Sequence, residues 1–136
     1  MPTSPPYFID TNIFIYTLFN VNRQKHHACI KLFKLAQAGK TSLWTTEWVT
    51  AELIWFLHKQ KFTWEKTKSV ITQILATSGL KVRGKKWILA ILALCPSAKD
   101  FIDAANITLA LSENITSGYS YDKDLDQWPQ FTRLKP

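Results

Sequence analysis

The chain has 136 residues, 46% of them hydrophobic, which suits one globular domain and excludes a disordered chain. Its formal net charge of +7 indicates a polyanionic partner, nucleic acid first, or simply a solvated basic surface. The two cysteines, Cys29 and Cys95, form no CxxC pair, which argues against a zinc site and predicts reduced, buried thiols in a cytosolic protein.

No segment has the features of a membrane span or a secretory signal. The longest apolar run, Trp87–Cys95, is too short for a bilayer and is stopped by Pro96. The first ten residues lack the basic and apolar regions of a signal peptide. We therefore expect a cytoplasmic protein that binds no membrane, with one domain over residues 1–136 and an irregular lead-in at residues 1–6.

Strands are predicted to alternate with helices along the chain. Apolar runs predict strands at residues 7–10, 41–45, 80–82, 116–121 and 131–134. Helical spacing and stop signals predict helices at residues 13–19, 23–38, 45–60, 64–77, 85–94 and 99–113. This alternation favours an α/β fold with a central parallel sheet and helices on both faces. Ligands in such sheets bind at the carboxyl ends of the strands.

The stretch YFIDTNIFIY has the composition of a buried strand, yet Asp10 stands in its middle. Burying an unpaired carboxylate costs several kcal/mol or forces it to take up a proton. Asp122 follows a late strand in the same way, so in one parallel sheet Asp10 and Asp122 open onto the same edge. We expect a cation to neutralise Asp10 at the strand's end.

Further acids join these two from other segments. Glu52 lies in an apolar helix, and Asp100 and Asp103 share a face at the start of another. Clustered carboxylates cannot all ionise without a cation, and Mg²⁺ and Mn²⁺ prefer such oxygen ligands. An acidic metal site within a basic chain suits phosphodiester hydrolysis. Each acid also has a structural alternative: helix capping for Asp10, Asp100 and Asp103, solvent exposure for Glu52, and a polar turn for Asp122, Asp124 and Asp126.

Four motifs together resemble a known family. The segments FIDTNIFIY, AELIWFL, DFIDAANITLA and SYDKDLDQWPQFTRLKP are similar to those of PIN domains and, within them, of VapC-type toxins of bacterial toxin–antitoxin pairs. The resemblance runs from about Phe8 to Pro136. It implies an α/β/α sandwich, ribonuclease activity dependent on Mg²⁺ or Mn²⁺, a homodimer, and a small antitoxin that inserts into the acidic groove.

The resemblance also assigns roles to individual residues. The expected catalytic set is Asp10, Glu52, Asp103 and Asp122. The expected metal ligands are Asp10, Asp103 and Asp122, with Glu52 orienting or activating the attacking water. Asn12, Asp100 and Ser120 are expected to support them. Tyr121 and Leu125 stand where phenylalanine is commoner in the family, and Asn106 is more polar than usual there; none of these departures removes a carboxylate.

Other functions fit less well. A non-catalytic RNA-binding protein with a PIN-like fold is the main alternative, although a dead site has no reason to keep mutually repelling acids. Phosphotransfer of the haloacid-dehalogenase kind needs a second aspartate two residues after the first, where this chain has Asn12. The four glycines are isolated and form no phosphate-binding loop. No G-x-S-x-G motif supports serine hydrolase chemistry.

Overall fold

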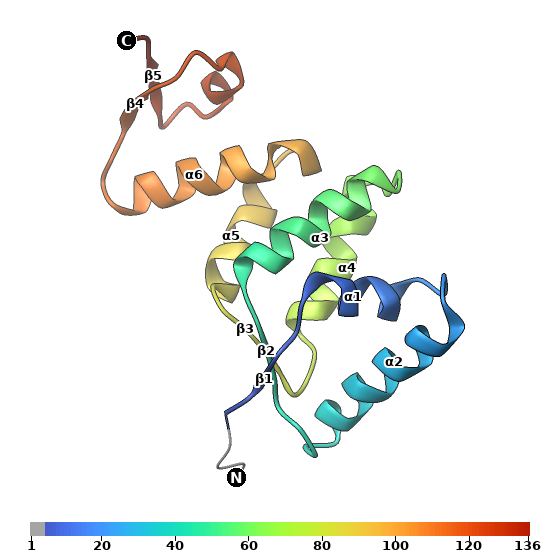
Figure 1. The fold of residues 1–136 in the computed structure, drawn as a ribbon. Coiled ribbons are helices and arrows are strands. Elements are labelled where there is room, and N and C mark those ends of the chain that lie inside the picture. The colour runs from blue at the N-terminus through green and yellow to red at the C-terminus, as the bar shows by residue number, and fades with distance from the viewer. Residues whose placement is uncertain (1–4) are drawn as a thin grey trace.

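Residues 5–136 are described by a computed structural model. The expected lead-in at residues 1–6 therefore lies mostly outside the described residues. The first part of the chain alternates strands and helices (Figure 1). Its elements are β1 (Tyr7–Phe8), α1 (Thr11–Leu18), α2 (Arg23–Gln37), β2 (Leu43–Thr45), α3 (Glu47–Lys59), α4 (Trp64–Leu75) and β3 (Leu80–Val82).

These first three strands form a parallel sheet in the order β1-β2-β3. In the register of the sheet, Leu43 of β2 lies between Tyr7 of β1 and Leu80 of β3. Helical connections join the successive strands, as parallel pairing requires. In Figure 1 the strands run between α5 on one side and α1 and α2 on the other.

The second part of the chain leads away from this sheet. Its elements are α5 (Lys85–Leu94), a 3₁₀ turn η1 (Ala98–Asp100), α6 (Phe101–Ser112), β4 (Ser117–Tyr119), a second 3₁₀ segment η2 (Lys123–Gln127) and β5 (Thr132–Leu134). β4 and β5 pair with each other in parallel and form a separate two-stranded sheet. Figure 1 shows this small sheet beyond α6, away from β1–β3.

The core lies among α3, α4, α5, α6 and the first sheet. Its most deeply buried side chains come from β2, α3 and α4, where Leu43, Leu57 and Ile71 have no exposed surface. Asn114 to Pro136 contains no fully buried residue, although Trp128 packs partly against the core. The C-terminal sheet is therefore held to the molecule less extensively than the helices are.

Most predicted elements are confirmed. The strand at residues 80–82 and the helix at residues 85–94 have the predicted bounds, and the other helices differ by a few residues at their ends. Thr46 caps α3 by accepting a hydrogen bond from the Val49 N–H. Both cysteines are free and buried, as expected. Among residues 5–136, no helix is long and apolar enough to cross a membrane.

Two expectations about the strands are wrong. The strand predicted at residues 7–10 covers only Tyr7 and Phe8, and both side chains are exposed. Asp10 is exposed as well, so burial does not explain its place in the sequence. The five strands also form two sheets rather than one, so β1 and β4 do not share an edge. The reason is that β4 pairs with β5, which leaves the outer edge of β1 without a strand among the described residues.

Candidate metal centre and neighbouring grooves

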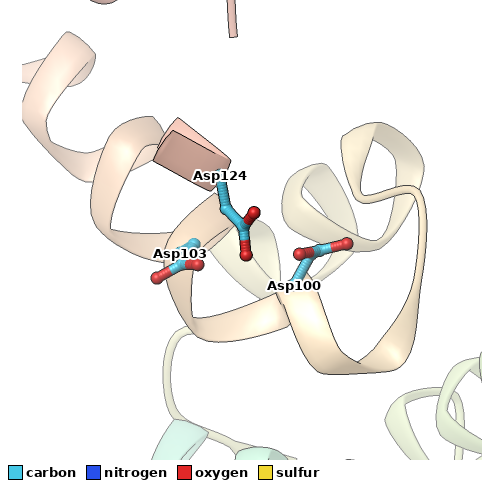
Figure 2. Close-up of side chains that lie close together, drawn as sticks. All are labelled: Asp100, Asp103 and Asp124. Atoms are coloured by element: carbon cyan, nitrogen blue, oxygen red, sulfur yellow. The ribbon is translucent and has the colours of Figure 1, made fainter. Parts of the chain in front are cut away.

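Three carboxylates meet where α6 begins. Asp100, Asp103 and Asp124 each offer an oxygen ligand atom, and these atoms all lie within 4.8 Å of one another. Asp100 comes from η1, Asp103 from the first turn of α6 and Asp124 from η2. Figure 2 shows the Asp124 carboxylate directed between the other two. Segments distant in the sequence therefore build one acidic cluster, defined as these three residues.

The chain around the acidic cluster fixes its members. Asp100 is only 8% exposed, and the Ser97 hydroxyl donates a 2.6 Å hydrogen bond to its Oδ2. Asp122 caps η2 by accepting a 2.9 Å hydrogen bond from the Asp124 N–H. The Ser120 hydroxyl in turn accepts a 3.0 Å hydrogen bond from the Asp122 N–H. Ser97 therefore positions Asp100, and Ser120 is linked to Asp124 through Asp122.

Electrostatic repulsion is the main property of this cluster. Partial burial raises the pKa of Asp103 above its ordinary value, and the charges of Asp122, Asp100 and Asp124 raise it further. Among the described residues, no ion pair joins a basic side chain to Asp100, Asp103 or Asp124. The donor set is all oxygen, which fits a hard divalent cation such as Mg²⁺ or Mn²⁺.

Lysines border the acidic cluster. A groove of about 300 Å³ is lined by Asp100 and Asp124 together with Lys99, Lys123 and Gln127. Both lysine side chains are exposed, so their ammonium groups are available to a phosphate. The groove therefore places two cations beside two carboxylates, an arrangement in which the lysines can hold an anion next to the acidic cluster.

Asp10 and Glu52 form a second acidic site. They line an open groove of about 500 Å³ with Asn12, Trp55 and Lys59 among its other residues. The Thr11 hydroxyl donates a 2.8 Å hydrogen bond to Glu52 Oε2, and Asp10 caps α1 by accepting a 2.8 Å hydrogen bond from the Thr11 N–H. Asp10 thus caps a helix, which was the structural alternative to metal binding given for it. Glu52 is exposed to solvent, which was the alternative given for that residue.

The structure groups the predicted site residues in two sets. Asp103 lies with Asp100 and within electrostatic reach of Asp122, whereas Asp10, Asn12 and Glu52 line the other groove. Helix α3, which carries Glu52, contacts both α1 and η1 and is the common neighbour of the two sets. Only Asp10 and Asp122 were expected at one sheet edge, and β1 and β4, the strands that precede them, belong to different sheets.

One member of the acidic cluster was missed by the sequence analysis. Asp124 was assigned only to a polar turn, yet it provides the third carboxylate of the cluster. No local spacing could have indicated this, because Asp124 reaches the start of α6 only through the fold of η2. The role of Thr11 as a link to Glu52 had no sequence signal.

Comparison with known proteins decides the family. The sequence matches the family model of the PIN domain over residues 7–129. The chain belongs to the PIN domain family. PIN domains are generally metal-dependent nucleases that act on nucleic acids, which agrees with the acidic cluster and its lysines. A search of curated proteins found no match.

Proposed function

We propose that this PIN domain is an endoribonuclease dependent on Mg²⁺ or Mn²⁺. The observation that carries the proposal is the acidic cluster, whose ligand atoms lie within 4.8 Å of one another. No basic side chain among the described residues pairs with these acids, so a divalent cation would relieve their repulsion. The net charge of +7 suits RNA as the polyanion.

Each predicted residue has a proposed role in this reaction. Asp103 and Asp122 hold the cation together with Asp10, and Asp124 joins them because it lies within the acidic cluster. A divalent cation supplies polarisation of the phosphodiester and a water of lowered pKa. Glu52 orients or activates that water, and its hydrogen bond from Thr11 keeps its carboxylate on the groove. Asn12, Asp100 and Ser120 position these groups.

We assign substrate binding to the basic residues. Lys99 and Lys123 border the acidic cluster, and Lys59 borders the groove of Asp10 and Glu52. Their ammonium groups hold the RNA backbone while the carboxylates act on the scissile phosphate. Helix α3 contacts both α1 and η1, the elements beside the two acidic sets, and so relates Asp10 and Glu52 to the acidic cluster.

The test is cleavage of a mixed RNA pool by the purified protein with Mg²⁺, Mn²⁺ or EDTA. Asp10→Asn and Asp103→Asn should each lower cleavage by at least about a hundredfold. Glu65→Gln is the matched control, because Glu65 pairs with Lys68 on the surface of α4, outside both acidic sets. Cleavage in EDTA, or full activity in both variants, would overturn the proposal. RNA binding without cleavage would favour the non-catalytic alternative.

A toxin role within a toxin–antitoxin pair is the finer part of the proposal. It is supported by the resemblance of the four motifs, which also implies a homodimer and an antitoxin partner in the cytoplasm. The two free, buried cysteines are typical of a reducing compartment. Expression of the wild type should arrest bacterial growth, and Asp10→Asn should abolish the arrest. Sedimentation of the purified chain measures the oligomeric state directly.

A further inference from the structure

Two grooves on the surface share residues and form one continuous path. The groove that contains Asp10 and Glu52 has a volume of about 500 Å³. A second groove of about 450 Å³ is lined by Trp55, His58, Lys59, Lys61 and Phe62. Trp55 and Lys59 belong to both linings. The two grooves therefore adjoin at Trp55, between the acidic residues and the end of α3; together we call them the Trp55 path.

Trp55 has the exposure and surroundings of a stacking platform. Its side chain is 49% exposed. The Lys59 ammonium lies 5.3 Å from the centroid of its ring, and the His58 ring lies 5.4 Å away, centroid to centroid. An aromatic ring beside cations is the combination that single-stranded nucleic acids use, because the ring stacks with a base while the cations hold the backbone.

Cations continue beyond Trp55. The Lys66 ammonium lies 4.6 Å from the centroid of the Phe62 ring, so a second aromatic residue with a cation follows the first. Lys61 has a φ of 66°, a left-handed conformation after a helix that glycine usually adopts. A lysine at this position adds a cation to the groove despite the backbone strain. No acidic residue lines the second groove.

We propose that the Trp55 path binds a single-stranded segment of RNA, with one unpaired base stacked on Trp55. The inference rests on the proposed nuclease function, since it places the stacked base one turn of α3 from Glu52. Bases inside a duplex are already stacked on their neighbours and cannot present a face to the ring. Trp55 therefore gains a role beyond the proposed nuclease chemistry, as the residue on which a substrate base stacks, and this sets where the strand lies relative to the acidic residues.

Binding without cleavage tests this inference. Fluorescein-labelled oligouridine, alone or annealed to oligoadenylate, is titrated with protein in EDTA and followed by anisotropy. The wild type should bind the single strand more tightly than the duplex. Trp55→Ala should weaken single-strand binding about tenfold, whereas Trp55→Phe should retain most of it. Lys59→Gln should lower the salt dependence of binding by about one phosphate contact.

Trp87→Ala is the matched control. Trp87 is also an exposed tryptophan, at 39%, and the Lys86 ammonium lies 5.8 Å from its ring centroid, but it lines neither groove of the Trp55 path. The affinity of the Trp87→Ala variant for oligouridine should equal that of the wild type. Equal affinity for duplex and single strand, no binding by the wild type, or equal losses in Trp55→Ala and Trp87→Ala would overturn the inference. Since EDTA prevents metal-dependent cleavage, these outcomes are separate from a failure of the nuclease proposal.

Discussion

The hydroxyl of Thr11 donates a 2.8 Å hydrogen bond to Glu52 Oε2, across a separation of 41 positions in the chain. Thr11 is only 8% exposed, and its backbone N–H donates a 2.8 Å hydrogen bond to Asp10 Oδ1. One buried residue therefore contacts both acids of the groove. It fixes the start of α1 against α3 and sets how the carboxylates of Asp10 and Glu52 lie relative to each other.

Replacing Thr11 should disturb this arrangement without creating a large cavity. Thr11→Val removes the hydroxyl, so Glu52 loses a charge-assisted hydrogen bond, and we expect the free energy of unfolding to fall by about 1 kcal/mol. RNA cleavage should fall as well, because Glu52 loses its orientation. Thr11→Ser keeps the hydroxyl and serves as the control. Urea unfolding and cleavage rates measure both effects, and equal behaviour of the two variants would show that the bond is unimportant.

The raised pKa of Asp103 leads to a prediction about stability. Since its pKa is higher in the folded protein, the folded state keeps the Asp103 proton to a higher pH than the unfolded state does. As the pH rises through that range, stability falls, and at neutral pH the ionised carboxylate opposes folding. Asp103→Asn should therefore raise Tm in EDTA at pH 7, by no more than roughly 2 °C because solvent screens the repulsion between these partly exposed carboxylates.

A divalent metal ion should reverse the order of the Tm values of the wild type and Asp103→Asn. A divalent cation that binds the folded wild type raises its Tm, and the same addition should raise the Tm of Asp103→Asn much less. Differential scanning fluorimetry with and without Mn²⁺ gives both numbers. Glu65→Gln is the control, since Glu65 pairs with Lys68 on α4 and away from the acidic cluster. A lower Tm for Asp103→Asn in EDTA would mean that its carboxylate stabilises the metal-free fold.

Local sequence patterns were sufficient to predict the elements themselves. The helix at residues 85–94 was predicted from an apolar run that Pro96 ends, and its bounds were confirmed. These features depend on residues within one or two turns of each other. The fold class followed from the alternation of strands and helices and is confirmed by the family.

Which carboxylates lie close together was harder to predict, because this depends on pairing between strands that are distant in the sequence. Asp10 and Asp122 were expected at one edge, but β4 pairs with β5 and not with β1. No local pattern states which of several short strands will be neighbours. Asp124 joins Asp100 and Asp103 through the fold of η2, a short 3₁₀ segment that apolar periodicity does not indicate.

Arg133 should hold the C-terminal sheet together. Its guanidinium is largely shielded, donates to both Asp126 oxygens at 2.9 and 3.0 Å, and also donates to the Ser120 carbonyl at 3.1 Å. One side chain of β5 thus links η2 with the end of β4. Arg133→Gln should speed amide hydrogen exchange across residues 117–134 and leave α3 and α4 unchanged. Uniform protection in the variant and the wild type would contradict this role.

The same contact should respond to acid. The hydrogen bond from Arg133 is the main cause of the lowered pKa of Asp126, so the folded state releases this proton at a lower pH than the unfolded state. Its stabilisation is complete above the ordinary aspartate pKa of about 3.9 and is lost as the pH falls through the lowered value. Exchange in residues 117–134 should therefore increase only below the ordinary aspartate range, whereas Asp126→Asn should show no such step.

Gly79 and Gly39 offer a matched pair for testing the fold beneath the site. Both have positive φ, 83° at Gly79 and 73° at Gly39, but an added Cβ at Gly79 would lie 2.2 Å from the Ala36 carbonyl oxygen, whereas at Gly39 it meets nothing within 4 Å. The Gly79 carbonyl also accepts the Leu43 N–H at 2.9 Å, next to the pairing of β2 with β3. A shift at Gly79 would therefore move the strand that leads into α3.

Substitution by alanine should destabilise the protein much more at Gly79 than at Gly39. Gly39→Ala carries only the left-handed backbone cost, about 1 kcal/mol, so its Tm should fall by roughly 4 °C. Gly79→Ala adds a backbone collision and should cost about 3 kcal/mol or more, a fall of at least roughly 12 °C. Thermal and urea unfolding compare the two. Similar losses would mean that α2 moves away from Gly79 at little cost, and that the packing of Ala36 does not constrain β2 and β3.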